Sequence, residues 1–219
     1  MIQSVLRIER AVKERRDVDV PLVNWWLYIL LLNPITFGIY SIYLFFKRAG
    51  RINKFIRRKR DYYLAILEYT EKYSQEKNKY NNLRNEINDL KDYTNNYIAK
   101  VKELKAGLSL ILSIITLGIY RFIYLYKINK IWNDIQNFET EFYDKLSQIW
   151  IKLGILKYPV SFNRDPSKNR GYIMYLILSI VTCGIFALIW DYKIHTDPDN
   201  LYKEFHSAED TILNAVRND

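Results

Sequence analysis

The chain has few of the residues that catalytic, metal-binding and disulfide-bonded proteins depend on. It contains one cysteine, Cys183, and two histidines, so it can form no intramolecular disulfide and holds no Cys/His cluster. It also lacks a glycine-rich phosphate loop and a nucleophile elbow. His195 and Asp197 are the nearest approach to an acid-base or metal pair, and no further ligands follow at a recognisable spacing. We therefore expect no enzyme, no catalytic residue, no metal and no cofactor.

Proline and glycine are also scarce, and three of the seven glycines fall in one repeated phrase. The phrase, Thr-x-Gly-Ile-aromatic, occurs at residues 36–40, 116–120 and 182–186. A lysine follows each threonine by eleven residues, so the register of the repeat extends well beyond the phrase. Because glycine adopts the backbone angles that a tight turn needs, we expect a kink at each copy. The predicted kink residues are Thr36, Gly38, Thr116, Gly118, Thr182 and Gly184.

Each copy lies in a long apolar block. Apolar residues make up 49% of the chain while charged residues still make up 26%, so the apolar residues must be concentrated. The blocks cover residues 22–46, 106–126 and 172–190, and roughly 20 residues suffice for a membrane helix. They have little of the polar face that soluble core helices carry. We predict three membrane-inserted segments, and the mixed charge of the first 21 residues does not fit a cleavable signal peptide.

The charges around the blocks leave two arrangements open. Basic residues flank both ends of every block, including Lys168 and Arg170 before the third, which favours hairpins whose two ends lie on one side of the membrane. An arm of about 12 residues rises about 18 Å, enough to enter one leaflet. Arg121 lies three residues beyond Gly118, however. Near the deepest point of a hairpin its charge would cost about 3 kcal/mol or more, whereas in a spanning helix it could extend to the interface.

A basic run follows the first block. Three interpretations are open: a signal that fixes topology, contact with anionic lipid headgroups, and binding of nucleic acid. The position directly after an apolar block favours lipid over nucleic acid, since each basic residue near an anionic leaflet contributes about 1 kcal/mol. The predicted anionic-lipid contacts are Lys47, Arg48, Arg51, Lys54, Arg57, Arg58, Lys59 and Arg60.

Residues 61–105 contain no proline and no glycine, and apolar residues recur there with a heptad spacing. A single helix of about 45 residues would be nearly 70 Å long and could not be buried in a small domain. Its partner would be residues 128–153 of the same chain or a second subunit, and we expect a homo-oligomer. The predicted oligomer seam is Tyr73, Tyr80, Leu83, Ile87, Leu90, Tyr97 and Val101.

Residues 176–193 resemble the signature of a prokaryotic membrane family known only as a domain of unknown function. That signature is a Leu-Ser-Ile-x-Thr-Cys-Gly-Ile-Tyr core followed by Trp-x-Tyr-Lys, and residues 113–127 look like a second copy. The first block departs from it through Asn33 and Pro34 and lacks the tryptophan. The resemblance implies an integral membrane protein of bacterial or archaeal type, with no assigned reaction and no catalytic residue to transfer.

Together these patterns predict an all-α integral membrane protein with three repeated kinked or re-entrant membrane helices joined by long coiled-coil-like helices. The expected units are residues 1–60 (tail, repeat 1 and basic flank), 61–105 (heptad helix), 106–127 (repeat 2), 128–170 (second amphipathic helix), 171–193 (repeat 3) and 194–219. The last unit, which contains His195 and His206, is interpreted as a solvated acidic tail that ends in a short helix.

The function expected from these units is that of a non-enzymatic scaffold. It would self-assemble through its long helices and organise or curve the lipid bilayer. The alternative is an oligomeric channel or transporter with three spanning helices per subunit, which should line a path with polar groups inside the membrane. The expected location is the cell membrane of a bacterium or archaeon, with the soluble segments in the cytoplasm.

Overall fold

The computed structural model describes residues 2–165 and 172–218, and these residues form helices, turns and loops without a β-strand. The predicted all-α class is therefore confirmed. The helices in chain order are α1 (Ile2–Lys13), α2 (Arg15–Val18), α3 (Trp25–Leu27), the π-helical η1 (Tyr28–Leu32), α4 (Asn33–Ile35), α5 (Ile39–Glu76), α6 (Tyr80–Lys100), α7 (Ala106–Ile115), α8 (Ile119–Leu153), α9 (Tyr172–Val181) and α10 (Ile185–Arg217).

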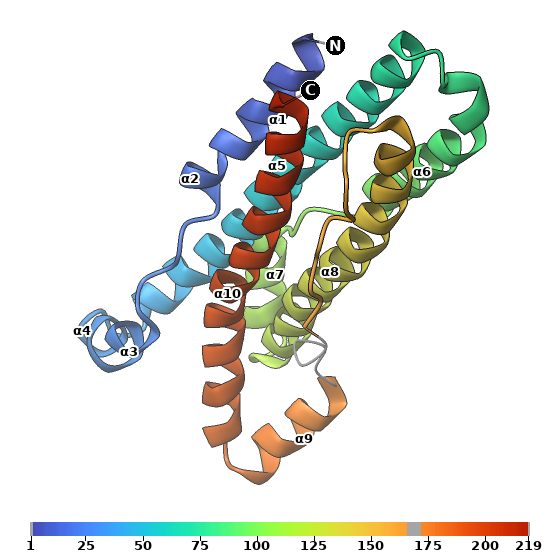
Figure 1. Cartoon of the computed structure of the whole chain (residues 1–219). Helices are drawn as coiled ribbons and strands as arrows, with labels where there is room; N and C mark the ends of the chain where they lie inside the picture. Colours follow the sequence, from blue (N-terminus) through green and yellow to red (C-terminus); the bar gives the residue numbers. More distant parts are fainter. Residues whose placement is uncertain (1, 166–171, 219) are drawn as a thin grey trace.

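The sequence repeat is also a repeat of architecture. Three times, a short apolar arm ends in a turn and is followed by a helix of 38, 35 or 33 residues. The arms are α3–η1–α4, α7 and α9, and the long helices are α5, α8 and α10. We call each arm, its turn and the beginning of the long helix that follows hairpin 1, 2 or 3 in chain order. Their turns lie toward the lower end of the molecule in Figure 1, away from both chain termini.

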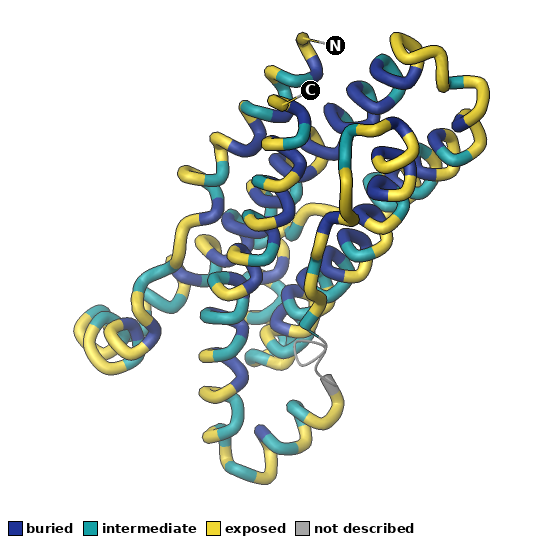
Figure 2. Tube along the Cα trace, viewed as in Figure 1, coloured by how far each residue is buried: buried dark blue, intermediate teal, exposed yellow. Residues whose placement is uncertain are grey.

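Beyond the hairpins, the long helices form a helical body with α1 and α6. α1 packs against α5 and α10, while α6 packs against α5 and α8. Buried residues recur along the helices of this body, whereas exposed residues predominate at the hairpin turns (Figure 2). The buried core of the upper body includes Ile66, Tyr69, Leu90, Phe142, Leu146, Trp150 and Ile212. A second cluster, nearer the hairpins, includes Ile52, Phe55, Tyr124, Trp132, Trp190 and Phe205.

The predicted single helix over residues 61–105 is wrong. α5 ends at Glu76, the chain turns through residues 77–79, and α6 returns along α5. The turn needs no glycine or proline because Asn78 takes a left-handed conformation, with φ of 55°, which asparagine tolerates better than most residues. α6 can therefore pack within its own chain.

The seam residues consequently face the interior of one chain. Tyr73, Leu83, Ile87 and Leu90 are buried in the upper core, and Tyr80 and Tyr97 pack against it. Val101 lies just after α6 and is half-buried. The premise that this segment needs a second subunit to cover it does not hold, and homo-oligomerisation stays a prediction without support from this seam.

Two further boundaries are corrected. α8 runs without a break from Ile119 to Leu153, so the second half of repeat 2 and the second amphipathic helix are one helix. α10 continues from Ile185 to Arg217 with Pro198 inside it, and one face of it is buried from Trp190 to Val216, so the described part of the last unit is a packed helix rather than a solvated tail. The basic flank formed by Lys168 and Arg170 lies outside the described residues.

Leu90→Ala tests the internal packing of α6. Leu90 is fully buried, so we expect the free energy of unfolding to fall by about 2–5 kcal/mol. Because the side chain packs within the chain, the loss should not depend on protein concentration in urea unfolding followed by circular dichroism. Ile151→Ala, on the exposed side of α8, is the matched control and should change stability little. A loss that grows on dilution would instead indicate a seam between subunits.

Candidate membrane-docking hairpins

The three hairpins turn through the same backbone conformation. The residue before each glycine is left-handed, with φ of 48° at Phe37 and 49° at both Leu117 and Cys183. Gly38, Gly118 and Gly184 follow with φ of 86°, 93° and 94°. Two left-handed residues in succession reverse the chain direction, and only the second position is a glycine. For the other, the left-handed conformation costs about 1–2 kcal/mol, so each turn holds one residue with a strained backbone.

The threonine of the phrase caps both helices of its hairpin. The hydroxyls of Thr36, Thr116 and Thr182 each donate to the carbonyl oxygen four residues earlier, at 2.7 Å in all three. The same hydroxyls accept the backbone N–H four residues later, at 2.9 or 3.0 Å. Each glycine N–H closes the first arm by donating to the carbonyl five residues earlier, at 2.7–2.9 Å. Backbone groups that a tight turn would leave unpaired are thus satisfied inside the turn.

Apolar side chains stand at the tips of these turns. Phe37 is 96% exposed and Leu117 is 95% exposed, and Cys183 at the equivalent position is also exposed. Exposed apolar residues continue along both arms of every hairpin, among them Leu30, Ile35, Ile39, Ile111, Ile115, Ile119, Ile173, Ile180 and Ile185. A contiguous apolar surface of this kind marks a site of interaction with a protein or a membrane.

Pro34 does not end the first arm. η1 precedes it with π-helical bonding, and α4 includes it, so the arm stays helical from Trp25 to Ile35. The π-helical stretch directly precedes Pro34, whose ring nitrogen has no N–H to donate to the preceding turn. Among the helices of residues 2–165 and 172–218, none combines the length and the apolar content that crossing a membrane requires.

Asp191 of α10 joins the three hairpins at their bases. Its carboxylate accepts two hydrogen bonds from Arg48 of α5, at 2.5 and 2.9 Å, and one from the indole N–H of Trp25, at 2.9 Å. The guanidinium of Arg121, from hairpin 2, lies 3.9 Å away. Burial opposes the ionisation of Asp191, but Arg48 outweighs it and lowers the pKa of Asp191 to about 2.

Arg121 is therefore not isolated. Its side chain is 52% exposed and extends from near the tip of hairpin 2 toward a carboxylate of hairpin 3. Hairpins 1 and 2 also meet through Tyr124, whose hydroxyl donates to the Phe45 carbonyl oxygen at 2.9 Å while the two rings stack 3.9 Å apart.

His195 lies buried beside this centre rather than in a solvated tail. Its Nε2 is 2.6 Å from the Val23 carbonyl oxygen, so Nε2 carries the proton and donates it. Its Nδ1 then accepts from Arg48 at 3.2 Å. Burial and the Arg48 charge lower the pKa of His195 to about 4, which keeps the ring neutral near pH 7.

A second buried charge cluster lies farther up the body. Arg58 pairs with Asp19 at 2.6 Å and with Glu209 at 2.9 Å, while Lys59 pairs with Glu209 at 2.9 Å and with Glu139 at 2.5 Å. Burial raises the pKa of Glu209, but Lys59 and Arg58 outweigh it and hold the pKa at about 2. Burial raises the pKa of Glu139 despite Lys59. His206 is held at Asp19 by a 2.8 Å contact.

Half of the predicted anionic-lipid contacts are consequently inside the protein. Arg48, Arg51, Arg58 and Lys59 are buried and paired with acids of the chain. These four cannot reach a headgroup, and their assignment to lipid is corrected. Of the other four, Arg57 makes two hydrogen bonds to Glu103, and Lys47, Lys54 and Arg60 are exposed.

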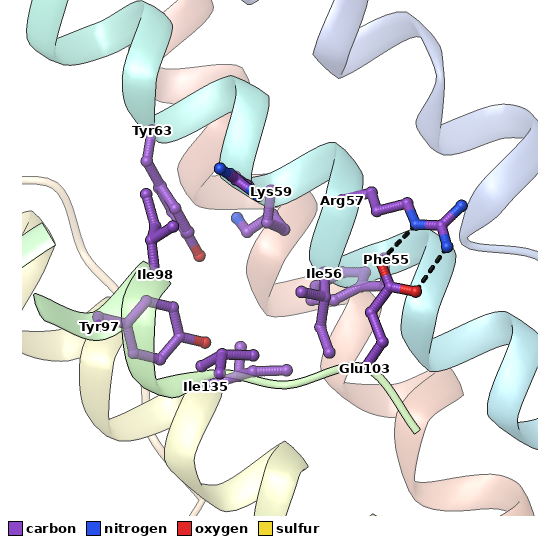
Figure 3. A pocket seen from close by; sticks show the side chains of 11 residues that line it. Phe55, Ile56, Arg57, Lys59, Tyr63, Tyr97, Ile98, Glu103 and Ile135 are labelled. Atoms are coloured by element: carbon purple, nitrogen blue, oxygen red, sulfur yellow. Dashed lines mark hydrogen bonds and ion pairs between the residues drawn. The ribbon is translucent and has the colours of Figure 1, made fainter. Parts of the chain in front are cut away.

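A small cavity lies where α5, α6 and α8 meet, in the body. It has a volume of about 70 Å³ and is lined mainly by apolar and aromatic side chains, including Tyr63, Tyr97, Ile98 and Ile135 (Figure 3). The pair of Arg57 and Glu103 stands at its edge. The cavity has room for about two waters, and its lysine, Lys59, already holds two carboxylates. We assign it no ligand.

The charge complementarity behind these pairs was visible in the sequence but was not recognised. The basic residues that become buried recur on the helix face that also carries Phe55 and Tyr62. Glu209, which pairs with both Arg58 and Lys59, lies about 150 residues later, in the segment interpreted as a tail. No cluster of His, Cys, Asp or Glu that could hold a metal occurs among the described residues.

The hairpins and body together define an all-α protein built from a thrice-repeated helical hairpin. Within it, residues 105–163 and 170–213 match the sequence profile of a family described as a domain of unknown function (DUF4234). The expected resemblance to such a family is thus confirmed over residues 105–213, which contain hairpins 2 and 3. Its membrane character and its signature stay predictions. No curated protein and no solved structure matches the chain.

Asp191→Asn tests the centre at the hairpin bases. The change leaves Arg48 buried without its counter-charge, so we expect the free energy of unfolding to fall by about 3–5 kcal/mol. Urea unfolding in a mild detergent measures the loss. The matched control is Asp134→Asn, whose pair with Lys130 is exposed and should contribute about 0.5 kcal/mol or less. Equal effects of the two changes would show that the buried pair has no special role.

His195 gives the protein a pH dependence that can be isolated. In the unfolded chain its pKa is about 6.5, and in the folded protein it is about 4, so the unfolded state binds the proton more readily between these values. Stability should therefore fall as the pH is lowered from about 6.5 to about 4. Asp191 and Glu209, with pKa values of about 2, stay ionised across this range. His195→Gln should remove part of the pH dependence, and an unchanged profile would contradict the assignment.

Proposed function

We propose that the protein is a non-enzymatic membrane-associated scaffold. Its three hairpins enter one leaflet of a bilayer from the same side, and the helical body stays at the surface. The observation that carries the proposal is the matched set of apolar, strained and exposed residues at the tips, Phe37, Leu117 and Cys183. Conformational strain is retained where function requires it, and a soluble body gains nothing from holding these side chains in water.

Entry from one side is supported by how the hairpins attach. The segment before hairpin 1 is held to α10 by the bond of Val23 to His195. The segment before hairpin 2 is held to α5, where Asn53 makes two hydrogen bonds with the backbone of Leu104, at 3.0 and 2.8 Å. The segment that leads toward hairpin 3 is held to α8 through Val160 and Asp165. Since each long helix also enters the body, both ends of every hairpin belong to one surface.

The dimensions fit a single leaflet. α7 and α9 have ten residues each, a length of about 15 Å, which is half of a hydrocarbon core of about 30 Å. Apolar wedges of this depth take up area in one leaflet and little in the other. The expected consequence is local curvature or the organisation of lipids around the body.

Assembly of several copies would strengthen such curvature, but the heptad seam is buried within the chain, so the proposal does not depend on it. A channel or transporter with three spanning helices per subunit is the competing outcome of the test below. The location at a bacterial or archaeal cell membrane, with the body in the cytoplasm, is part of the proposal.

The lone cysteine supplies the probe. An environment-sensitive fluorophore on Cys183, or on Phe37→Cys or Leu117→Cys in a Cys183→Ser background, should shift to the blue on vesicles of phosphatidylcholine and phosphatidylglycerol. Nitroxides on the acyl chains should quench all three labels. A label on Asn95→Cys, an exposed position on α6, is the control and should respond to a water-soluble quencher added outside the vesicles.

Each remaining outcome decides against a part of the proposal. Tip labels that stay in water on every vesicle would contradict insertion. Spanning segments would be favoured by either of two results. The label on the body would respond only to a water-soluble quencher trapped inside the vesicles, or that trapped quencher would reach the labels at the tips. Electron microscopy separates the functions, because tubulated vesicles support a scaffold, whereas intact vesicles that leak ions support a pore.

A further inference from the structure

A groove lined by five lysines lies at the base of hairpin 2, and we propose that it binds the phosphate of an anionic lipid headgroup. The proposal rests on the insertion of the hairpins and names the lipid contact that this insertion would make. The groove has a volume of about 390 Å³ and runs beside the start of α7 and the neighbouring part of α8. Its lysines are Lys100, Lys102, Lys105, Lys127 and Lys130.

The charge of this groove is largely uncompensated. Among the described residues, no carboxylate pairs with Lys100, Lys102, Lys105 or Lys127, and Lys130 pairs with Asp134 at 2.8 Å. Glu103, which also lines the groove, accepts hydrogen bonds from Nε and Nη2 of Arg57, at 2.6 and 2.5 Å. The groove therefore presents several free ammonium groups to one space.

Hairpin 1 differs in this respect, although the sequence beside it is more basic. Arg48, Arg58 and Lys59 have their charges matched by buried acids, and Arg51 is matched by the half-buried Asp199. Half of the charges of that run are thus matched inside the protein, whereas four of the five lysines of the groove have no carboxylate partner among the described residues. Only the paired contacts in the folded chain reveal this difference.

The distance of the groove from the turn of hairpin 2 fits the level of a lipid headgroup. Lys127 follows Gly118 by nine residues, or about 14 Å along a helix. Lys105 directly precedes α7, so it lies about 15 Å from the turn. If the turn of hairpin 2 lies near the middle of the bilayer, the lipid phosphates are about half of a 30 Å hydrocarbon core above it. Lys105 and Lys127 lie at that distance from the turn. They stand at both ends of the hairpin, as an interfacial ring would require.

The walls of the groove suit an amphipathic ligand. Leu108 and Ile131 line it beside the lysines, and Leu108 belongs to the exposed apolar surface of α7. Lys127 is held in place because its ammonium donates to the Tyr120 hydroxyl at 2.8 Å and lies 5.1 Å from the centre of that ring. A phosphate would contact the ammonium groups while the attached chains continue along α7, which favours a membrane lipid over a free phosphate.

Vesicle binding by the full chain tests the groove. Co-sedimentation is measured on phosphatidylcholine vesicles with and without phosphatidylglycerol, for the unmodified chain and for the variant Lys100→Gln, Lys102→Gln, Lys105→Gln. Each lysine removed should weaken binding to the anionic vesicles about fivefold, which corresponds to about 1 kcal/mol. The three together should therefore weaken it about 100-fold, while binding to neutral vesicles stays unchanged.

The matched control removes the same charge elsewhere, through Lys77→Gln, Lys157→Gln and Lys203→Gln, on exposed positions of the body. An equal loss in both variants would overturn the groove and indicate a general effect of net charge. Titration with inorganic phosphate separates the two sources of phosphate, and saturable binding of it without any preference for anionic vesicles would also overturn the proposal. Failure of the groove alone leaves binding to neutral vesicles intact, whereas loss of binding to every vesicle refutes the insertion of the hairpins.

Discussion

The hairpins keep their arrangement because two arginines and an indole meet at Asp191. Arg48, Trp25 and Arg121 come from hairpins 1 and 2, and Asp191 comes from hairpin 3. The short apolar arms make few contacts with one another, so their direction is set where they enter the body. The buried carboxylate holds those positions, because separating it from Arg48 would leave two buried charges without compensation, and separating it from Trp25 would break a buried hydrogen bond.

The repeated phrase has a physical explanation at each of its positions. The threonine satisfies backbone groups of both helices, the variable residue occupies the exposed left-handed position, and the glycine completes the reversal. The isoleucine then begins the long helix. The aromatic residue follows it, and its backbone N–H donates a hydrogen bond to the threonine hydroxyl. In a lipid environment an unpaired backbone group costs several kcal/mol, so a turn that satisfies its own groups suits the tip of an inserted wedge.

The helical class, the three turns and the apolar arms were all predictable, because each depends on residues close together in the sequence. The break at Asn78 was missed because one asparagine in a polar stretch is a weak turn signal. The burial of Arg58 and Lys59 was missed for a different reason. Their partner Glu209 lies about 150 residues away, and a basic run next to an apolar block is normally a solvated flank. Helical spacing on the face of Phe55 and Tyr62 was the available clue.

The buried charges also help to explain why some apolar residues form the core of the body while others stay exposed on the arms. Half of the residues are apolar, and they include both the core of the body and the exposed arms. Hydrophobic burial is non-directional, so by itself it would draw the arms into the body. Buried ion pairs are often no more stabilising than apolar groups of the same size. Their effect here is to favour one alignment of the long helices, because a shift of α5, α8 or α10 would leave Lys59, Glu139 or Glu209 as an unpaired buried charge. In that alignment Phe37, Leu117 and Cys183 are exposed at the turns of the hairpins.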